Sequence, residues 1–350
     1  MKEPKVICED IEKLTEEEWL KLRTTGIGGS DAAKILGVSG FSTSRDLYYD
    51  KVGENKPDIK KNWIALEVGH RLEELVVQIF MEKNPGWFPY ADRRMFRSAE
   101  YPFMLADVDF FVRDPNTGKV GIVECKTTNS ITLLEKWGIP LENKVPVDYE
   151  LQVRHYMAVM NLDFAIIICL AGNNEQGYRQ RLVTRDLSIE KSLIEAEKRF
   201  WEENVLKRIP PALDNQKASV LDTVVNHYGL LSAETEDDTV DLSDSVKDFE
   251  KYLSLKEERS ALEKQAKELK KQEEEIVASL LDMTEGRSGI CTIEDIDYEL
   301  SSSSRTTISI PSAKLQNLKL EYPDIYNKYV EVKTSVSPTI KKIKAKKKAV

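Results

Sequence analysis

The chain has 350 residues, of which 41% are hydrophobic and 32% charged, and its formal net charge is −9. One small core cannot cover this length, so we expect a large domain with an appendage, or two domains. The acidic balance argues against nucleic-acid binding over the whole surface. No apolar run reaches the roughly 20 residues of a membrane span, and the N-terminus lacks a signal-peptide pattern. We therefore expect a cytoplasmic protein that binds no membrane.

The cysteines Cys8, Cys125, Cys169 and Cys291 lie far apart and form no CxxC motif. Zinc knuckles and iron–sulfur sites need clustered cysteines, so neither is indicated. We expect four reduced thiols.

The first third of the chain predicts helices separated by a glycine-rich turn. A capping box from Thr15 to Glu18 opens a short helix, and Ser30-Asp31 is predicted to cap another helix over 32–36. Further helices are expected over 43–51 and 65–84, the second one with apolar residues at helical spacing.

The middle of the chain predicts a β-meander of strands at 94–98, 103–113 and 119–127, with a turn at 114–118. A helix over 145–160 follows. The apolar run 165–170 predicts a strand covered on both faces, 178–184 an edge strand and 189–206 a last helix.

Pro210-Pro211 marks a predicted boundary between a domain over 1–210 and an accessory region over 211–350. The accessory region begins with an acidic linker. A charged helix over 245–282 has apolar residues every seventh position, but its other core positions are too polar for a stable coiled coil, so a helical arm is expected. A hairpin over 290–310 that turns at 301–304, a short helix over 311–320 and a lysine-rich tail at 341–348 complete it. The tail is either solvated or in contact with DNA phosphates.

The segment that ends in Asp109 and the segment Val123-Glu124-Cys125-Lys126 carry the strongest chemical signal. Because a strand places side chains i and i+2 on one face, Glu124 and Lys126 point together, beside Asp109. Carboxylates that bind hard divalent cations, with a nearby lysine, are a means of cutting phosphodiesters. The alternative is a surface ion pair on an exposed strand.

Two helices add candidates to this array. Glu73 borders the apolar stripe of the helix over 65–84 and can point toward a metal, although a solvated helix face is the alternative. His70 is interpreted as a polar border residue. Gln152 lies on the helix over 145–160, and alone it carries no information.

Gly26-Ile27-Gly28-Gly29-Ser30 precedes a predicted helix start, where free N–H groups favour an anion. A simple cap after a flexible turn is the alternative. Arg23, just upstream, favours phosphate because a guanidinium can donate two hydrogen bonds to phosphate oxygens.

Taken in order, these residues resemble the YqaJ-type viral recombinases, which are similar to phage lambda exonuclease and belong to the PD-(D/E)xK nuclease superfamily. The resemblance spans residues 10–210. It rests on these motifs: Leu22-Arg23 with Gly26 to Ser30, Gly69 with Glu73, Asp109, Glu124 with Lys126, and Gln152 with Tyr156. It implies an α/β fold with a restriction-endonuclease-like core, a central mixed sheet flanked by helices, to which we add a helical and small β C-terminal extension.

The resemblance also implies roles. Glu73, Asp109 and Glu124, with the backbone carbonyl of Cys125, would bind Mg²⁺, for which Mn²⁺ can substitute. Lys126 would activate the attacking water, Gln152 would steady the site, and Arg23 with Ser30 would hold a 5′-phosphate. A departure from the family pattern, Asp107-Val108-Asp109-Phe110, leaves open whether Asp107 shares the role of Asp109.

The function implied is a Mg²⁺-dependent 5′→3′ exonuclease of phage or prophage type, which digests double-stranded DNA ends and leaves 3′ overhangs for recombination. Its implied partners are a single-strand annealing protein of the RecT or Red-beta type and further copies of itself in a trimeric ring. The alternatives are a structure-specific endonuclease and a catalytically idle DNA-binding scaffold. A CRISPR-associated nuclease with clustered cysteines is disfavoured.

Overall fold

The computed structural model describes residues 3–54, 63–139, 143–229, 240–285, 287–294, 296–300 and 312–330. The chain divides into two compact units, Met1–Leu231 and Ser232–Val350. The first unit contains every candidate site residue named above. The two units are described separately, and the predicted functional division at residue 210 stays a prediction.

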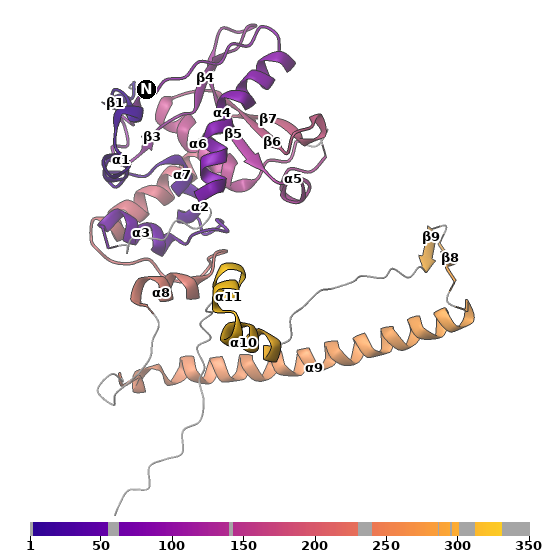
Figure 1. Ribbon diagram of the computed structural model, residues 1–350. Helices are drawn as coiled ribbons and strands as arrows, with labels where there is room; N and C mark the ends of the chain where they lie inside the picture. Colours follow the sequence, from indigo (N-terminus) through magenta and orange to yellow (C-terminus); the bar gives the residue numbers. More distant parts are fainter. Residues whose placement is uncertain are drawn as a thin grey trace, which may run out of the picture. The chain divides into compact units, whose positions relative to one another are not determined.

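A four-stranded mixed sheet forms the centre of the first unit (Figure 1). Its order is β4 (Phe110–Arg113), β5 (Val120–Thr128), β6 (Phe164–Ala171) and β7 (Tyr178–Thr184). The β5 and β6 strands run parallel, and the two outer pairs are antiparallel. The parallel pair requires a crossover, which the helices after β5 provide.

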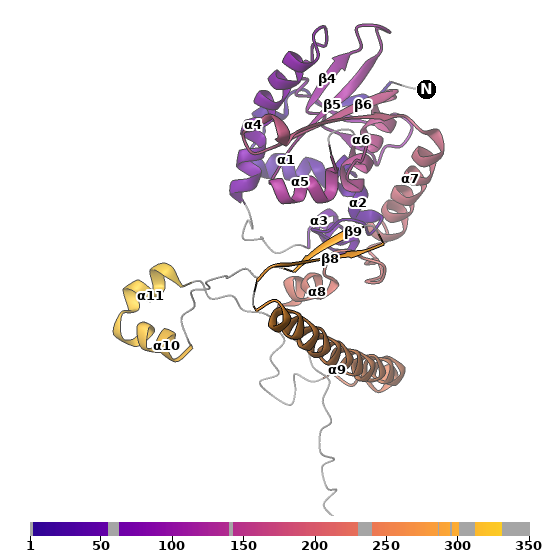
Figure 2. The ribbon, with the colours of Figure 1, turned by 90° about the vertical axis from the view of Figure 1, so that its right-hand side faces the viewer.

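Helices cover both faces of this sheet (Figure 2). Alternate residues of β6 enter two different cores, so Ile166 and Ile168 pack with α4 (Trp63–Lys83), whereas Ile167 packs with α6 (Val147–Met160). Every residue of β6 is buried. The predictions of a doubly covered strand at 165–170 and an edge strand at 178–184 are confirmed.

The predicted β-meander is wrong, because its first strand belongs to another sheet. The strands β1 (Lys5–Cys8), β2 (Met95–Arg97) and β3 (Leu105–Ala106) form a separate antiparallel sheet. The expected continuous strand over 103–113 is broken at 107–109, where the chain crosses from β3 to β4. At this crossover the Asp109 carboxylate accepts the Cys125 N–H at 3.0 Å.

The N-terminal helices are α1 (Glu16–Arg23), α2 (Ala32–Ile35) and α3 (Ser44–Val52), and a 3₁₀ turn over Gly29–Asp31 precedes α2. The capping box of Thr15 and Glu18 is confirmed. Asp31 takes the N-cap position of α2 as predicted, but its side chain makes no capping bond to that helix, because the carboxylate accepts the Gly28 N–H and pairs with lysines. Before this turn, Ile27 forms an isolated parallel β-bridge with Met104, through backbone bonds to Phe103 and Leu105.

Three helices complete the first unit beyond those already given: α5 (Ser130–Trp137), α7 (Leu187–Arg199), which continues as a π-helical turn over Phe200–Val205, and α8 (Val220–Tyr228). The sequence analysis did not predict α5 or α8. The α8 helix packs on the first unit through buried Thr223, whose hydroxyl lies 3.0 Å from that of Thr43.

The second unit contains the long helix α9 (Val246–Met283), the hairpin of β8 (Gly289–Ile293) and β9 (Ile296–Leu300), and the helices α10 (Ser312–Glu321) and α11 (Pro323–Tyr329). None of the described residues of α9 is buried. A hairpin is present and turns after Ile293, whereas the predicted turn at 301–304 falls on residues that the structure does not describe. Residues 301–311 and the lysine-rich tail lie outside the described residues.

The predicted fold class, an α/β core with a central mixed sheet between helices, is therefore confirmed. All four cysteines are free, as expected. Within the described ranges, no helix combines the length and the apolar character that crossing a membrane requires.

Candidate active site

The strand β5 presents Glu124 and Lys126 on the same face, as the sequence predicted. Their side chains form an ion pair, with the Lys126 ammonium donating to Oε1 of Glu124. Val123 and Cys125 point to the opposite core, which contains α4. Glu124 is only 1% exposed, so the alternative of an ion pair on an exposed strand is excluded.

Gln152 of α6 completes the surroundings of Glu124. Its amide Nε2 donates to Oε1 of Glu124 at 2.7 Å, so this one carboxylate oxygen accepts from both Gln152 and Lys126. The other oxygen, Oε2, is buried and has no hydrogen-bond partner among the residues that the structure describes. An unpartnered buried carboxylate oxygen is costly, so this atom is available to a ligand.

Burial and the neighbouring Asp109 raise the pKa of Glu124 to about 8, against the opposing effect of Lys126. Burial also raises the pKa of Asp109, although Lys126 and the Cys125 N–H oppose it. The pKa of Glu73 is raised by burial and by Asp109. Each of these carboxylates therefore binds its proton more tightly than it would in water, a state that a cation would relieve.

Lys126 is held on two sides. Its ammonium contacts Glu124 and lies 5.2 Å from the ring centroid of Tyr149, a residue of α6. Burial alone would lower the pKa of Lys126, but Glu124 and Asp109 raise it above its usual value. Lys126 is therefore a fixed positive charge at neutral pH.

Carboxylate oxygens are the ligands that hard divalent cations prefer, and the buried Oε2 of Glu124 is such an oxygen without a hydrogen bond. The residues present therefore fit a cation of this kind. The side chains are not closed around such an ion. In the described part of the chain no group of three His, Cys, Asp or Glu residues is gathered as a ready metal site. Lys126 and Gln152 instead hold Glu124, while Asp109 is anchored on the backbone of Cys125.

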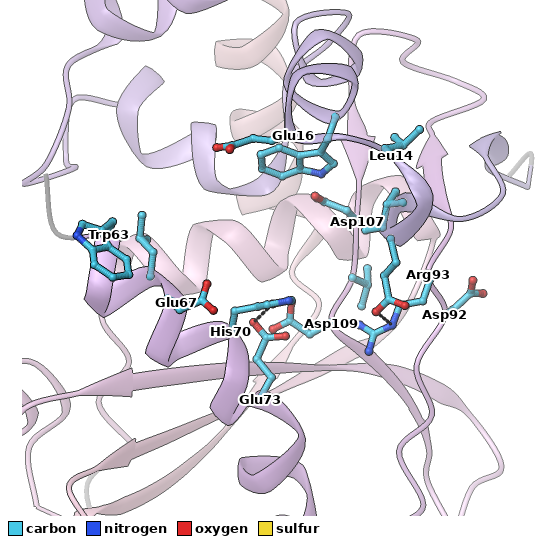
Figure 3. A pocket seen from close by; sticks show the side chains of 15 residues that line it. Leu14, Glu16, Trp63, Glu67, His70, Glu73, Asp92, Arg93, Asp107 and Asp109 are labelled. Carbon is cyan, nitrogen blue, oxygen red and sulfur yellow. Dashed lines mark ion pairs between the residues drawn. The ribbon is translucent and has the colours of Figure 1, made fainter. Parts of the chain in front are cut away.

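An open groove of about 990 Å³ has Asp109 and Glu73 in its lining, which Figure 3 shows. Glu73 and Asp109 line it from α4 and from the strand crossover, and His70 lies 3.6 Å from the Glu73 carboxylate. Trp63 and Leu66 line the groove from the first turn of α4. The side chain of Leu66 is 69% exposed, so the apolar residues at helical spacing in this helix do not all face the core.

Arg23 and Ser30 are brought together as predicted, with the guanidinium Nη2 donating to the Ser30 hydroxyl at 2.9 Å. The guanidinium also lies 4.9 Å from the ring centroid of Trp19. The turn between them is packed against α6, since a Cβ at Gly29 would lie 2.6 Å from the Tyr156 ring and 3.0 Å from Gln152. The Arg23–Ser30 pair is therefore joined to the helix that supports Glu124.

Asp107 and Asp109 have different surroundings. The Tyr156 hydroxyl donates to Asp107 at 3.1 Å, whereas Asp109 accepts the Cys125 N–H. Both residues line the groove. Asp109 is thus the aspartate tied to the strand of Glu124, as predicted, and Asp107 is tied to α6.

Comparison with known proteins shows to which family the chain belongs. The model of the YqaJ-like viral recombinase domain matches residues 18–163. The uncharacterized protein YqaJ of Bacillus subtilis (strain 168) is 32% identical over 320 residues, which cover 90% of this chain and 91% of that protein. The chain belongs to the YqaJ family. All candidate site residues lie within the matched domain.

Solved structures resemble the core of this chain at lower sequence identity. The alkaline exonuclease LHK-Exo of Laribacter hongkongensis is 18% identical with a TM-score of 0.44, and the match covers 55% of this chain and 94% of that one. A phage-related exonuclease of Haemophilus somnus 129PT is 13% identical with a TM-score of 0.37, covering 54% and 99%. Similarity at this level carries no argument about activity.

Sequence reasoning missed two residues of this site, Tyr149 and Lys51. Tyr149 lies three residues before Gln152 on α6 and therefore shares its face, a spacing that could have revealed it. Lys51, which pairs with Asp31 at 2.8 Å, had no signal in the sequence because α3 meets the glycine-rich turn only in the folded chain.

Proposed function

We propose that this YqaJ-family protein is a metal-dependent deoxyribonuclease that digests double-stranded DNA from 5′ ends and leaves 3′ single-stranded overhangs. The observation that carries the proposal is the buried Glu124, held by Lys126 and Gln152 beside Asp109, with one oxygen left unpartnered. Family membership supports a role in recombination.

Mg²⁺ is the proposed cofactor, with Mn²⁺ as a substitute, held by Glu73, Asp109, Glu124 and the carbonyl of Cys125. A bound divalent cation would supply a nucleophilic hydroxide near neutral pH and offset charge on the leaving 3′-oxygen. Lys126 contributes a fixed positive charge to the phosphodiester and orients the attacking water. Gln152 holds the Glu124 carboxylate through Oε1, which leaves Oε2 available to the cation.

The 5′→3′ polarity is proposed from the Arg23–Ser30 pair. A half-buried guanidinium that donates to an exposed hydroxyl offers several donors to a terminal phosphate. The turn that carries Ser30 contacts α6 through Gly29, and α6 carries Gln152, the partner of Glu124. The proposed phosphate-binding pair is therefore linked to the proposed site of hydrolysis. A 5′-phosphorylated strand is the ligand that suits this arrangement.

The proposed partners are a single-strand annealing protein, which would take up the 3′ overhang, and further copies of this chain in a ring around DNA. Both come from the family resemblance. Light scattering of the purified protein measures the oligomer directly, and a stable monomer on DNA would remove the ring from the proposal.

The test uses linear duplex DNA labelled on one 5′ or one 3′ end, with Mg²⁺ or with a chelator. We expect degradation only with Mg²⁺, with early release of the 5′ label and retention of the 3′ label. Glu124→Gln and Lys126→Met should lose at least about 100-fold in rate. The matched control is Glu150→Gln, on the same helix as Gln152 but paired with Arg154.

Intact DNA with the wild-type protein, or equal digestion by both site variants, would reject the nuclease. A covalently closed duplex in the same assay separates the alternatives. Cutting of the closed duplex would indicate an endonuclease, whereas binding without any cutting would indicate a scaffold.

A further inference from the structure

Beneath the Arg23–Ser30 pair lies a buried ion pair between Asp31 and Lys51. Their side chains are only 3% and 4% exposed, and the Lys51 ammonium is 2.8 Å from Oδ2 of Asp31. The same Oδ2 accepts the Gly28 N–H at 3.1 Å. Asp31 directly follows Ser30, and its carboxylate binds the backbone of Gly28, two residues before Ser30. The contact therefore closes the glycine-rich turn around Ser30.

Lys51 also reaches the other member of the end-binding pair. Its ammonium donates to the backbone carbonyl of Arg23 at 2.9 Å, at the C-terminal end of α1. Lys51 comes from α3, so this single group connects three segments: α1, the turn over Gly29–Asp31, and α3. Asp31 and Lys51 thus connect the Arg23 backbone to the turn that carries Ser30.

The local charges leave Arg23 available to an anion. The second oxygen of Asp31 is closer to Lys34, at 3.1 Å, than to the Arg23 guanidinium, at 3.9 Å. Three cations thus surround one carboxylate in contact range. Burial alone would raise the pKa of Asp31, but these cations hold it well below its usual range, so the carboxylate stays charged. Asp107 and Asp50 add negative charge in the field of Arg23.

We propose that Asp31 and Lys51 are positioning residues for a 5′-phosphate site, in which they hold Arg23 and Ser30 at the spacing that a terminal phosphate needs. This inference rests on the proposed function, because it assigns the discrimination between phosphorylated and unphosphorylated ends to a pair that touches neither DNA nor the carboxylate cluster. The ligand class is a phosphomonoester at a DNA end.

The test compares 5′-phosphorylated with 5′-hydroxyl linear duplex, by digestion rate and by fluorescence anisotropy of binding in a chelator, where no cutting occurs. The variants are Lys51→Met, which removes the contact with the Arg23 carbonyl, and Asp31→Asn, which removes the buried charge. Lys51→Arg is the conservative variant. Glu190→Gln is the control, since it opens a largely buried ion pair with Arg185 elsewhere in the same unit.

We expect Lys51→Met and Asp31→Asn to reduce the preference for the phosphorylated end at least about fivefold, in rate and in affinity, while digestion of the hydroxyl end changes less than twofold. Lys51→Arg should restore part of the preference, and Glu190→Gln should keep all of it. A merely structural role predicts instead that both ends slow equally.

Two results would overturn the inference while the proposed function stands: an unchanged preference in folded Lys51→Met, or an equal loss on both ends. A wild-type protein without nuclease activity would instead reject the proposed function. The anisotropy preference still tests the inference in that case. Circular dichroism verifies folding, and if Asp31→Asn fails to fold, Lys51→Met and Lys51→Arg decide alone, because Asp31 then keeps Lys34 and the Gly28 N–H.

Discussion

At the scale of single residues, the site depends on how Lys126 is shared between a carboxylate and an aromatic ring. Glu124 accepts from the ammonium, and the Tyr149 ring faces it from α6. When Glu124 turns its oxygens to another ligand, the ring remains as a partner for the charge. Tyr149 is therefore expected to keep Lys126 in place during the reaction.

Replacing Tyr149 with leucine should slow DNA hydrolysis about tenfold, because a partly desolvated cation–π contact contributes about 1 kcal/mol or more. Tyr149→Phe keeps the aromatic face and should stay within about twofold of the wild type. Single-turnover rates on linear duplex measure both. If the phenylalanine variant slows as much as the leucine variant, the hydroxyl and not the ring would be the important group.

The raised pKa values of Glu73, Asp109 and Glu124 predict how stability depends on pH in the presence of a chelator. Because folded-state values above the unfolded values favour the protonated form, stability is full below the unfolded pKa of about 4.5 and is lost as pH rises toward 8. The thermal midpoint should fall over this window. Glu124→Gln should flatten that fall, and an equal slope in both proteins would refute the assignment.

At the scale of elements, a buried histidine connects α7, α6 and β3. Nδ1 of His155 lies 2.8 Å from the Glu197 carboxylate, and Nε2 lies 2.8 Å from the Leu105 carbonyl. Both partners are acceptors, so the ring must donate from both nitrogens and carry a charge. Burial alone would lower the pKa of His155, but Glu197 raises it. Leu105 precedes the crossover to Asp109, so this contact also supports the site.

Glu197→Ala should lower the free energy of unfolding by about 3–5 kcal/mol, because it leaves a buried charge without its partner. Glu202→Ala, on the following turn and in an exposed pair with Lys198, should change it by less than about 1 kcal/mol. Urea denaturation followed by circular dichroism measures both. Similar values for the two variants would show that His155 is not charged in the folded protein.

The sequence predicted elements best where one local pattern decides the structure. The alternation in β5 placed Glu124 and Lys126 on one face, and the apolar run of β6 required two cores. The break between β3 and β4 was not predictable in this way, because it depends on a long-range bond from Asp109 to the Cys125 backbone. The side-chain contacts of Asp31 were not predictable for the same reason: its lysine partner comes from another helix.

At the scale of the whole molecule, every candidate site residue lies in the unit Met1–Leu231, and the segment 211–228 packs within that unit. The Thr223 hydroxyl donates to Asp46 at 2.9 Å, and the Ser44 N–H donates to the Gln216 side chain at 3.1 Å. The functional boundary that the double proline at 210–211 predicts is a separate question, which a truncation tests.

A fragment of residues 1–229 should therefore fold and keep the DNA-digesting activity, whereas a fragment of residues 1–210 should melt at a lower temperature, because it exposes the surface of α3 that α8 covers. Scanning calorimetry of the two fragments beside the full chain measures this difference. Equal melting temperatures would place the functional boundary at residue 210 after all.

The close packing of Gly29 on Tyr156 has one more consequence. Because there is no room for even a methyl group between Gly29 and α6, the turn that carries Ser30 and the helix that carries Gln152 are held in one fixed arrangement. On the proposed function, the 5′-phosphate site and the site of hydrolysis are then held at a constant distance along the DNA strand. The fragments released should then be uniform in length from the first cut to the last.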